Sequence, residues 1–126
     1  MKHPEDNLQI MVANYLDLTG WLWAHVANER KTSPRAGGQL KKKGVKRGVP
    51  DVMIFEAWEM HEINADCDAL ECYGFGIAIE LKSEKGRLTP EQKQWLDALE
   101  QRGWLTAVCY SLDEVREVVS VLRGAF

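Results

Sequence analysis

Apolar residues recur along the chain in two patterns, one with the spacing of an α-helix and one with the alternation of a β-strand. Apolar positions recur at helical spacing between Pro4 and Leu18, where Pro4 suits the first turn and Gly20 suits the end of a helix. One face of this predicted helix is apolar and should be buried. The positions are Leu8, Met11, Val12, Tyr15 and Leu16.

Four short apolar segments predict β-strands. They are Trp21–Ala27, Asp51–Phe55, Gly76–Lys82 and Trp104–Tyr110. The third alternates strictly, so Ile77, Ile79 and Leu81 should point into a core while Glu80 and Lys82 share the opposite face.

Two capping boxes predict where the last two helices begin. The first, Thr89 to Gln92 with Pro90 inside it, opens a helix that ends near Arg102. The second runs from Ser111 to Glu114. The inward positions are Trp95, Leu96 and Leu99 in the first helix and Val115, Val118, Val119 and Leu122 in the second. The order is helix, three strands, helix, strand, helix, which predicts an α/β fold with one mixed four-stranded sheet flanked by helices.

Length and composition are those of one ordinary globular domain spanning residues 1–126. No apolar run approaches the ~20 residues of a membrane span, and the N-terminal residues do not resemble a signal peptide. We therefore expect a cytoplasmic protein without a membrane partner. The three cysteines suggest free thiols. Cys109 reads as a core residue, and the spacing of Cys67 and Cys72 is not that of a zinc site.

The net charge of −3 hides two oppositely charged segments. Residues 30–47 contain no acidic residue and carry +8, whereas the rest of the chain carries −11. We interpret them as a glycine-rich loop with at most one short helix near Gln39–Lys43. Such a segment is either a solvated loop or a surface that attracts a polyanion. Its basic residues are Arg30, Lys31, Arg35, Lys41, Lys42, Lys43, Lys46 and Arg47.

Residues 57–75 form an acidic segment that is long for a hairpin connection. We expect an irregular insertion there, with an extra helix near Trp58–Ile63. It would shape substrate choice or a dimer contact, and its charge would keep it away from a bound duplex.

The charged residues of the second and third strands suggest an active site. If these strands pair antiparallel, Asp51 lies beside Glu80 and Lys82. Two neighbouring carboxylates repel each other unless a divalent cation joins them, and Mg²⁺ binds one or two carboxylates together with waters and phosphate oxygens. The small Gly76 and Ala78 on the same face would leave room for something bulky to approach.

Three other polar residues have both a structural and a functional interpretation. Glu5 is either a helix-start residue or part of the site, and Gln92 is either the last member of a capping box or a site residue. His25 is expected to be a partly buried strand residue, with DNA contact as the alternative. The five tryptophans are expected in the core and in a dimer interface.

The strings Gly48-Val49-Pro50-Asp51 and Ile79-Glu80-Leu81-Lys82 resemble the PD-(D/E)XK nuclease motif. The longer segments around these motifs resemble the VRR-NUC branch of the PD-(D/E)XK superfamily. They are GVKRGVPDVMIF and IAIELKSEKGRLTPEQKQWLDALEQRGW. The branch also shows an early Glu and Gln, matched by Glu5 and Gln9, and a Gly-hydrophobic strand, matched by Gly103-Trp104. The resemblance covers essentially the whole chain.

The resemblance implies a PD-(D/E)XK core and a DNA phosphodiesterase that depends on Mg²⁺ or Mn²⁺. Asp51, Glu80 and the Leu81 carbonyl would bind the metal, and Glu5 would bind it directly or through water. Lys82 would position the attacking water, and Gln92 would support the site. The basic residues 30–47 would hold phosphates. Family members include the catalytic domain of a eukaryotic DNA-repair nuclease and standalone phage and bacterial proteins, the latter thought to act as dimers on four-way junctions.

The function predicted is therefore a structure-selective endonuclease on branched DNA, similar to a Holliday-junction resolvase and working as a homodimer without an organic cofactor. Two alternatives stay open. One is a 5′ flap nuclease or exonuclease. The other is a catalytically silent nucleic-acid-binding module on the same fold.

Overall fold

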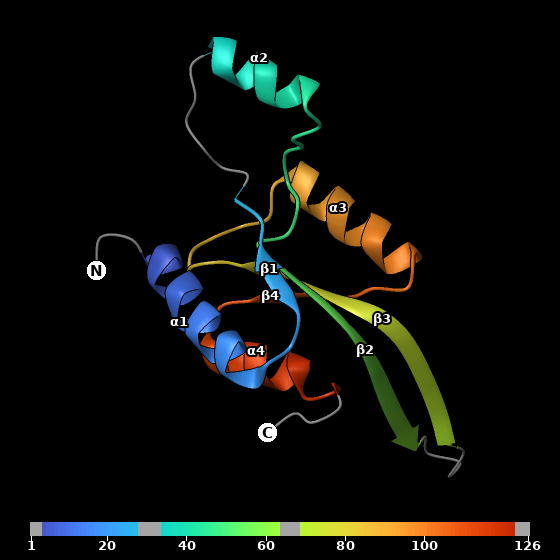
Figure 1. Cartoon of the computed structure of the whole chain (residues 1–126). Helices are drawn as coiled ribbons and strands as arrows, with labels where there is room; N and C mark the ends of the chain where they lie inside the picture. The colour runs from blue at the N-terminus through green and yellow to red at the C-terminus, as the bar shows by residue number, and fades with distance from the viewer. Residues whose placement is uncertain (1–3, 28–33, 64–68, 123–126) are drawn as a thin grey trace.

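A computed structural model describes residues 4–27, 34–63 and 69–122. Four helices and a four-stranded sheet make up the fold (Figure 1). In chain order they are α1 (Pro4–Thr19), β1 (Trp23–His25), α2 (Pro34–Lys42), β2 (Val52–Ile63), β3 (Ala69–Leu81), α3 (Pro90–Gln101), β4 (Leu105–Cys109) and α4 (Leu112–Val119).

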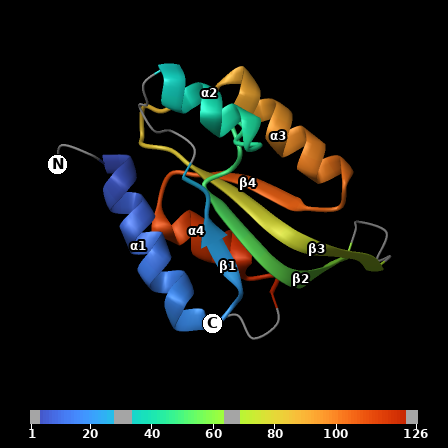
Figure 2. The same cartoon turned by 45° about the horizontal axis from the view of Figure 1, so that its top comes forward.

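The sheet has the strand order β1-β2-β3-β4. β1 pairs antiparallel with β2, and β2 pairs antiparallel with β3, whereas β4 runs parallel to β3. A parallel neighbour needs a crossover connection, and α3 supplies it. Helices α1 and α4 cover one face of the sheet and α3 covers the other (Figure 2). The expected mixed sheet between helices is confirmed.

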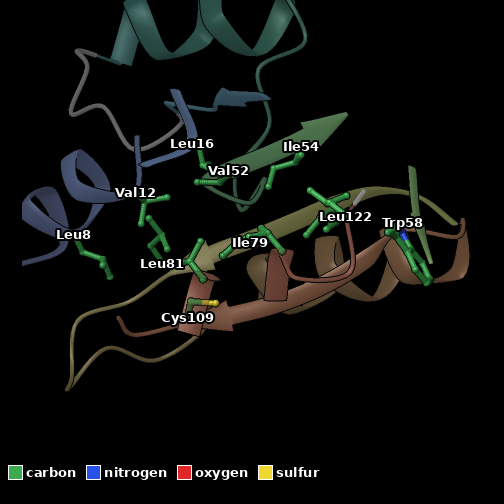
Figure 3. Close-up of a cluster of buried hydrophobic side chains, with 13 residues drawn as sticks. Leu8, Val12, Leu16, Val52, Ile54, Trp58, Ile79, Leu81, Cys109 and Leu122 are labelled. Carbon is green, nitrogen blue, oxygen red and sulfur yellow. The ribbon is translucent and has the colours of Figure 1, made fainter. Parts of the chain in front are cut away.

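The larger core lies between the sheet and the α1–α4 face (Figure 3). From α1 it takes Leu8, Val12 and Leu16, which recur at helical spacing. Met11, predicted to be buried with them, is half exposed. The strands add Val52, Ile54, Ile77, Ile79 and Leu81, all nearly inaccessible to solvent. A second, smaller core of Met53, Ala78 and Leu99 lies under α3. Strands β2 and β3 therefore contribute apolar side chains to both faces of the sheet, as expected for central strands covered by helices on both sides.

The acidic segment is a long hairpin, so the expectation of an irregular insertion with a helix near Trp58–Ile63 is wrong. Strands β2 and β3 continue their pairing from Ala57↔Phe75 to Ile63↔Ala69. A bulge at Phe55 and Glu56, opposite Gly76, interrupts the ladder. Apolar and polar residues alternate only weakly in this segment. The pairing of β2 with β3 here depends on contacts with the partner strand and not on a local sequence pattern.

The side chain of Trp58 anchors this bulge. Its Nε1 donates a hydrogen bond to the Gly76 carbonyl at 3.1 Å. Gly76 has φ +91°, and a Cβ there would collide with the ring of Trp104. All five tryptophans contact the two cores: Trp58 is a buried member, and Trp21, Trp23, Trp95 and Trp104 pack against them. Their predicted core role is confirmed.

The cap of α3 matches its prediction, but that of α4 does so only in part. At α3 both reciprocal hydrogen bonds of the Thr89–Gln92 box are present. At α4 the Ser111 hydroxyl accepts from the Glu114 N–H, but the Glu114 carboxylate accepts from Tyr110 N at 2.6 Å. In the described ranges, no helix is long and apolar enough to cross a membrane.

Candidate active site

The predicted site residues gather at one end of the sheet. The start of β2, the end of β3 and the N-termini of α1 and α3 converge there, with α2 standing beyond them (Figure 2). The β2–β3 ladder pairs Val52 with Ile79, so Asp51 and Glu80 are the next residues along the two strands. The antiparallel pairing expected from the sequence is confirmed, and it is what brings these two carboxylates to one place.

Asp51 is tied to both neighbouring strands. Its Oδ2 accepts a hydrogen bond from the Leu81 N–H of β3 at 2.8 Å. Its backbone carbonyl accepts one from the Val26 N–H at 2.9 Å and lies 2.8 Å from His25 Nδ1. Pro50, which is fully buried, fixes the approach of the chain to this point. The carboxylate is therefore held in one orientation at the start of β2.

Glu80 is a carboxylate with only 2% of its surface exposed. Its Oε1 accepts a hydrogen bond from Gln92 Nε2 at 3.1 Å, and Lys82 Nζ lies 4.0 Å from the same oxygen. A buried carboxylate is costly unless polar or charged groups compensate it. Both compensating groups come from residues predicted to belong to the site, so Glu80, Lys82 and Gln92 form one cluster.

Lys82 is also buried, with 7% of its surface exposed. Its backbone N–H donates to the Cys109 carbonyl of β4 at 3.0 Å, which fixes the end of β3. The stem of its side chain runs beside Gly86, where an added Cβ would lie 3.1 Å from Lys82 Cδ and 3.2 Å from Cβ. Gly86 therefore leaves the space through which the lysine reaches the carboxylates. Sequence reasoning missed this glycine, because nothing in the local pattern links it to Lys82.

Glu5 approaches the cluster from α1. Its Oε1 accepts a hydrogen bond from the Ser83 N–H at 3.1 Å, and the same oxygen lies next to Gly86. Within the part of the chain that is described, no group of three or more His, Cys, Asp and Glu side chains is close enough to hold a metal ion together. Glu5 thus borders the site beside Lys82 and is not gathered into one ligand set with Asp51 and Glu80.

The donors at this end of the sheet fit a hard divalent cation. Asp51 and Glu80 offer carboxylate oxygens from adjacent strands, and Leu81 lies between Glu80 and Lys82 with its N–H already used by Asp51. Mg²⁺ is commonly held by one or two carboxylates, with water and phosphate oxygens completing its shell. Two carboxylates are therefore sufficient, and the third predicted carboxylate is not needed as a direct ligand.

Gly48 is a second residue whose importance only the structure reveals. It has φ +87°, and a Cβ there would lie 2.6 Å from the Glu91 carbonyl carbon and 2.8 Å from the Gln92 nitrogen. The turn that leads to Asp51 thus packs directly on the first turn of α3. The sequence shows a glycine two residues before Pro50, but it does not show that this glycine contacts Glu91, which is 43 positions away.

The space beside the small residues on the Glu80 face is filled by bulky groups of the protein itself. Ala78 packs with Met53 and Leu99 under α3, and Gly76 lies against the Trp104 ring. The bulky groups on this face are therefore α3 and Trp104. Access to the cluster is therefore confined to the end of the sheet.

The described basic residues lie next to this end. Helix α2 buries no residue and is longer than the short helix expected near Gln39–Lys43. The helix ends at Lys42, and the turn after it contains Gly44, which has φ +96°. All six described cations are exposed: Arg35, Lys41, Lys42, Lys43, Lys46 and Arg47. Arg30, Lys31 and Cys67 lie outside the described residues. The hairpin that carries the acidic segment extends away from α2 (Figure 1).

His25 differs from its prediction. It is exposed rather than partly buried, and its ring meets the backbone of Asp51. Cys109 is buried as predicted, and burial, together with the carboxylate of Glu114, raises the pKa of its thiol to about 12. Cys72 is exposed and free.

Comparison with known proteins agrees with this geometry. The sequence profile of the VRR-NUC domain matches residues 3–113. A solved structure described as a VRR_NUC domain protein superposes with a TM-score of 0.69 at 25% sequence identity, covering 97% of this chain and 89% of that one. No curated protein matches the chain. With the profile match spanning most of its length, the chain belongs to the VRR-NUC family and carries a nuclease-type domain.

Proposed function

We propose that this protein is a metal-dependent endonuclease that hydrolyses phosphodiester bonds in branched DNA, in the manner of a Holliday-junction resolvase. The observation that carries the proposal is the convergence of Asp51, Glu80 and Lys82 at one end of the sheet, beside an exposed basic helix. Glu80 and Lys82 are almost inaccessible to solvent. Buried charged groups rarely stabilise a fold more than apolar residues of similar size would. Their presence here fits a catalytic role.

The metal, Mg²⁺ or Mn²⁺, would be held by Asp51, Glu80 and the Leu81 carbonyl, with Glu5 acting through water. Bound there, it would polarise the phosphate and lower the pKa of a bound water. Lys82 would orient the water and offset charge on the phosphate. Gln92 would keep Glu80 in position through its 3.1 Å hydrogen bond.

DNA would be held mainly through its phosphates. Six exposed cations lie on α2 and the turn that follows it, and the chain runs from them directly into Pro50 and Asp51. Such contacts fix the position of a duplex without reading its sequence. Selection by DNA shape follows from this kind of contact. The acidic hairpin points away from α2 and so does not oppose the approach of DNA (Figure 1).

A homodimer in the cytoplasm completes the proposal. The described chain holds one cluster of catalytic character, and cutting both strands of a four-way junction symmetrically requires two. A second copy related by two-fold symmetry supplies the second site in the simplest way.

A cleavage panel tests the function. Four-way junction, 5′ flap, splayed arm, linear duplex and single strand are each incubated with the protein in Mg²⁺ and in Mn²⁺. Asp51→Asn is the control variant, because an asparagine oxygen can still accept the Leu81 N–H and preserve the fold. We expect the junction to be cut best, and Asp51→Asn and Lys82→Ala to bind DNA without cutting it.

The outcomes separate the alternatives. Preferential cutting of flaps or of free 5′ ends would favour a flap nuclease or exonuclease. Binding with no cleavage by the wild type in either metal would favour the silent module. Full cleavage by both variants would show that the site lies elsewhere.

A further inference from the structure

We propose that His25 is a positioning residue that closes the base of the basic loop and holds Asp51 in its working position. Here the basic loop means residues 27–50, the segment between β1 and β2. The inference rests on the proposed nuclease function for its catalytic consequence. The contact itself is independent of that function and can be tested without DNA or metal.

The chemistry of the contact fixes the state of the imidazole nitrogen. His25 Nδ1 lies 2.8 Å from the Asp51 backbone oxygen. A carbonyl oxygen accepts hydrogen bonds and cannot donate, so Nδ1 carries the proton. The same oxygen accepts the Val26 N–H at 2.9 Å. Both acceptor positions of the Asp51 carbonyl are thus filled by consecutive residues at the end of β1.

The location of this contact matters because the strand ladder stops there. The β1–β2 pairing runs from Trp23↔Ile54 to His25↔Val52, and Asp51 is the next residue. β1 is only three residues long and lies at the edge of the sheet. The His25 ring therefore adds a hydrogen bond where the pairing of the three-residue strand β1 ends. Without it, Asp51 is fixed from β1 by one backbone bond.

On its other side Asp51 is held by β3 through the Leu81 N–H, at 2.8 Å from Oδ2. The backbone and the carboxylate of Asp51 are therefore anchored to two different strands. A shift of the Asp51 backbone away from β1 would turn the carboxylate away from Leu81. The two anchors depend on each other through the single residue between them.

The basic loop joins this point to the surface proposed to hold DNA. Its described part carries all six exposed cations, and α2 within it buries no residue. Helix α2 has no buried anchor of its own, and the chain after it first packs at Gly48 and Pro50, just before Asp51. A pull on α2 is therefore transmitted to the segment that leads into Asp51, which His25 holds from the β1 side. His25 is exposed, so its ring nitrogen could be satisfied by water and does not need the Asp51 carbonyl. Resistance of Asp51 to such a pull gives this hydrogen bond a role.

Three variants of the full chain separate positioning from other roles: His25→Ala, His25→Asn and His25→Gln. The amide nitrogen of Asn stands the same number of bonds from Cα as Nδ1, so Asn can restore the donor. The nitrogen of Gln is one bond further out and cannot replace it in the same place. Gln is thus the matched control for a polar amide at this position.

The first readout is amide hydrogen exchange of Leu81 and Val26, measured by NMR on the protein alone. We expect faster exchange at both amides in His25→Ala and His25→Gln, with near wild-type protection in His25→Asn. The second readout is single-turnover cleavage at saturating DNA. There we expect a loss of about tenfold or more for Ala and Gln, recovery for Asn, and DNA dissociation constants within about twofold of wild type.

Unchanged protection of Leu81 in His25→Ala would overturn the proposal, as would an Asn variant no better than Gln. If Ala is too unstable to study, the comparison of Asn with Gln decides. If the wild type itself cuts no DNA, the proposed function fails, while hydrogen exchange still decides whether His25 positions Asp51.

Discussion

The side-chain amide of Gln92 joins the start of α3 to the most buried carboxylate of the site. Its Oε1 accepts the Thr89 N–H at 2.9 Å, which completes the helix cap, and its Nε2 donates to Glu80 Oε1 at 3.1 Å. One residue thus performs both roles that its position in the sequence suggested. The cap sets the side chain in the orientation that the contact with Glu80 requires.

Gln92→Ala and Gln92→Glu should separate these two roles. Ala removes the acceptor for the Thr89 N–H and the buried donor to Glu80 together, and we expect a loss of about 1–3 kcal/mol in the free energy of unfolding. Glu keeps an acceptor for the Thr89 N–H, but it places a second carboxylate against Glu80. Its stability deficit should shrink as the pH falls, because protonation of one carboxyl group removes the repulsion. Urea unfolding at acidic and neutral pH measures both, and a pH-independent deficit in the Glu variant would contradict the contact.

Gly48→Ala should be more harmful than Gly44→Ala. Both glycines have positive φ, so each substitution costs about 1–2 kcal/mol of backbone strain. Only at Gly48 does the new Cβ also meet backbone, 2.6 Å from the Glu91 carbonyl carbon, whereas at Gly44 nothing lies within 4 Å. We expect an additional loss of about 1–3 kcal/mol for Gly48→Ala, from the overpacking of the chain against α3. Equal midpoints in urea for the two variants would show that this packing is not tight.

The salt dependence of DNA binding should report the contribution of α2 and its turn. Replacing Lys41, Lys42 and Lys43 by Gln should weaken binding to all DNA substrates and lower the slope of log affinity against log salt by up to about 3. Arg102→Gln is the control, because Arg102 is exposed at the opposite end of α3 and its Nη1 donates to Ala98 O. Fluorescence anisotropy over a salt series measures the slopes. A slope change per removed charge that is as large for Arg102→Gln as for the triple variant would indicate attraction by net charge and no defined contact surface.

Alkaline pH should weaken the fold through Cys109. Burial raises the pKa of this thiol to about 12 in the folded chain, against an ordinary 9.0. The unfolded chain therefore loses its proton first, so stability falls as the pH rises from about 9 towards about 12 and is unaffected below that window. Cys109→Ala should show a shallower fall than wild type, and Cys72→Ala, at an exposed thiol, should not. Parallel falls in all three proteins would assign the alkaline loss to other groups.

Local signals in the sequence were sufficient for most elements and for picking out the charged residues that cluster at the end of the sheet. The periodic stripe of α1, the apolar run around Ile79 and the Thr89–Gln92 box each depend on neighbours within a few positions, and such interactions are readable from a single stretch of chain. Asp51, Glu80 and Lys82 stood out because charged residues interrupt or follow apolar strands. The hairpin over residues 57–75 was missed, because its stability comes from cross-strand pairs and a bulge, neither of which leaves a regular local pattern.

By itself, then, the sequence determined the α/β element order, singled out the charged residues Asp51, Glu80 and Lys82, and separated the +8 segment from the acidic remainder. Only the tertiary structure decided which of these residues meet. It placed Glu5 against Ser83 and outside a common ligand set, filled the face beside Ala78 with α3, and put the exposed ring of His25 on the Asp51 carbonyl. The reason is physical: His25 and Asp51 are 26 positions apart, and Glu5 and Ser83 are 78 apart, so the geometry of such contacts depends on strand register and helix packing, which no local pattern specifies.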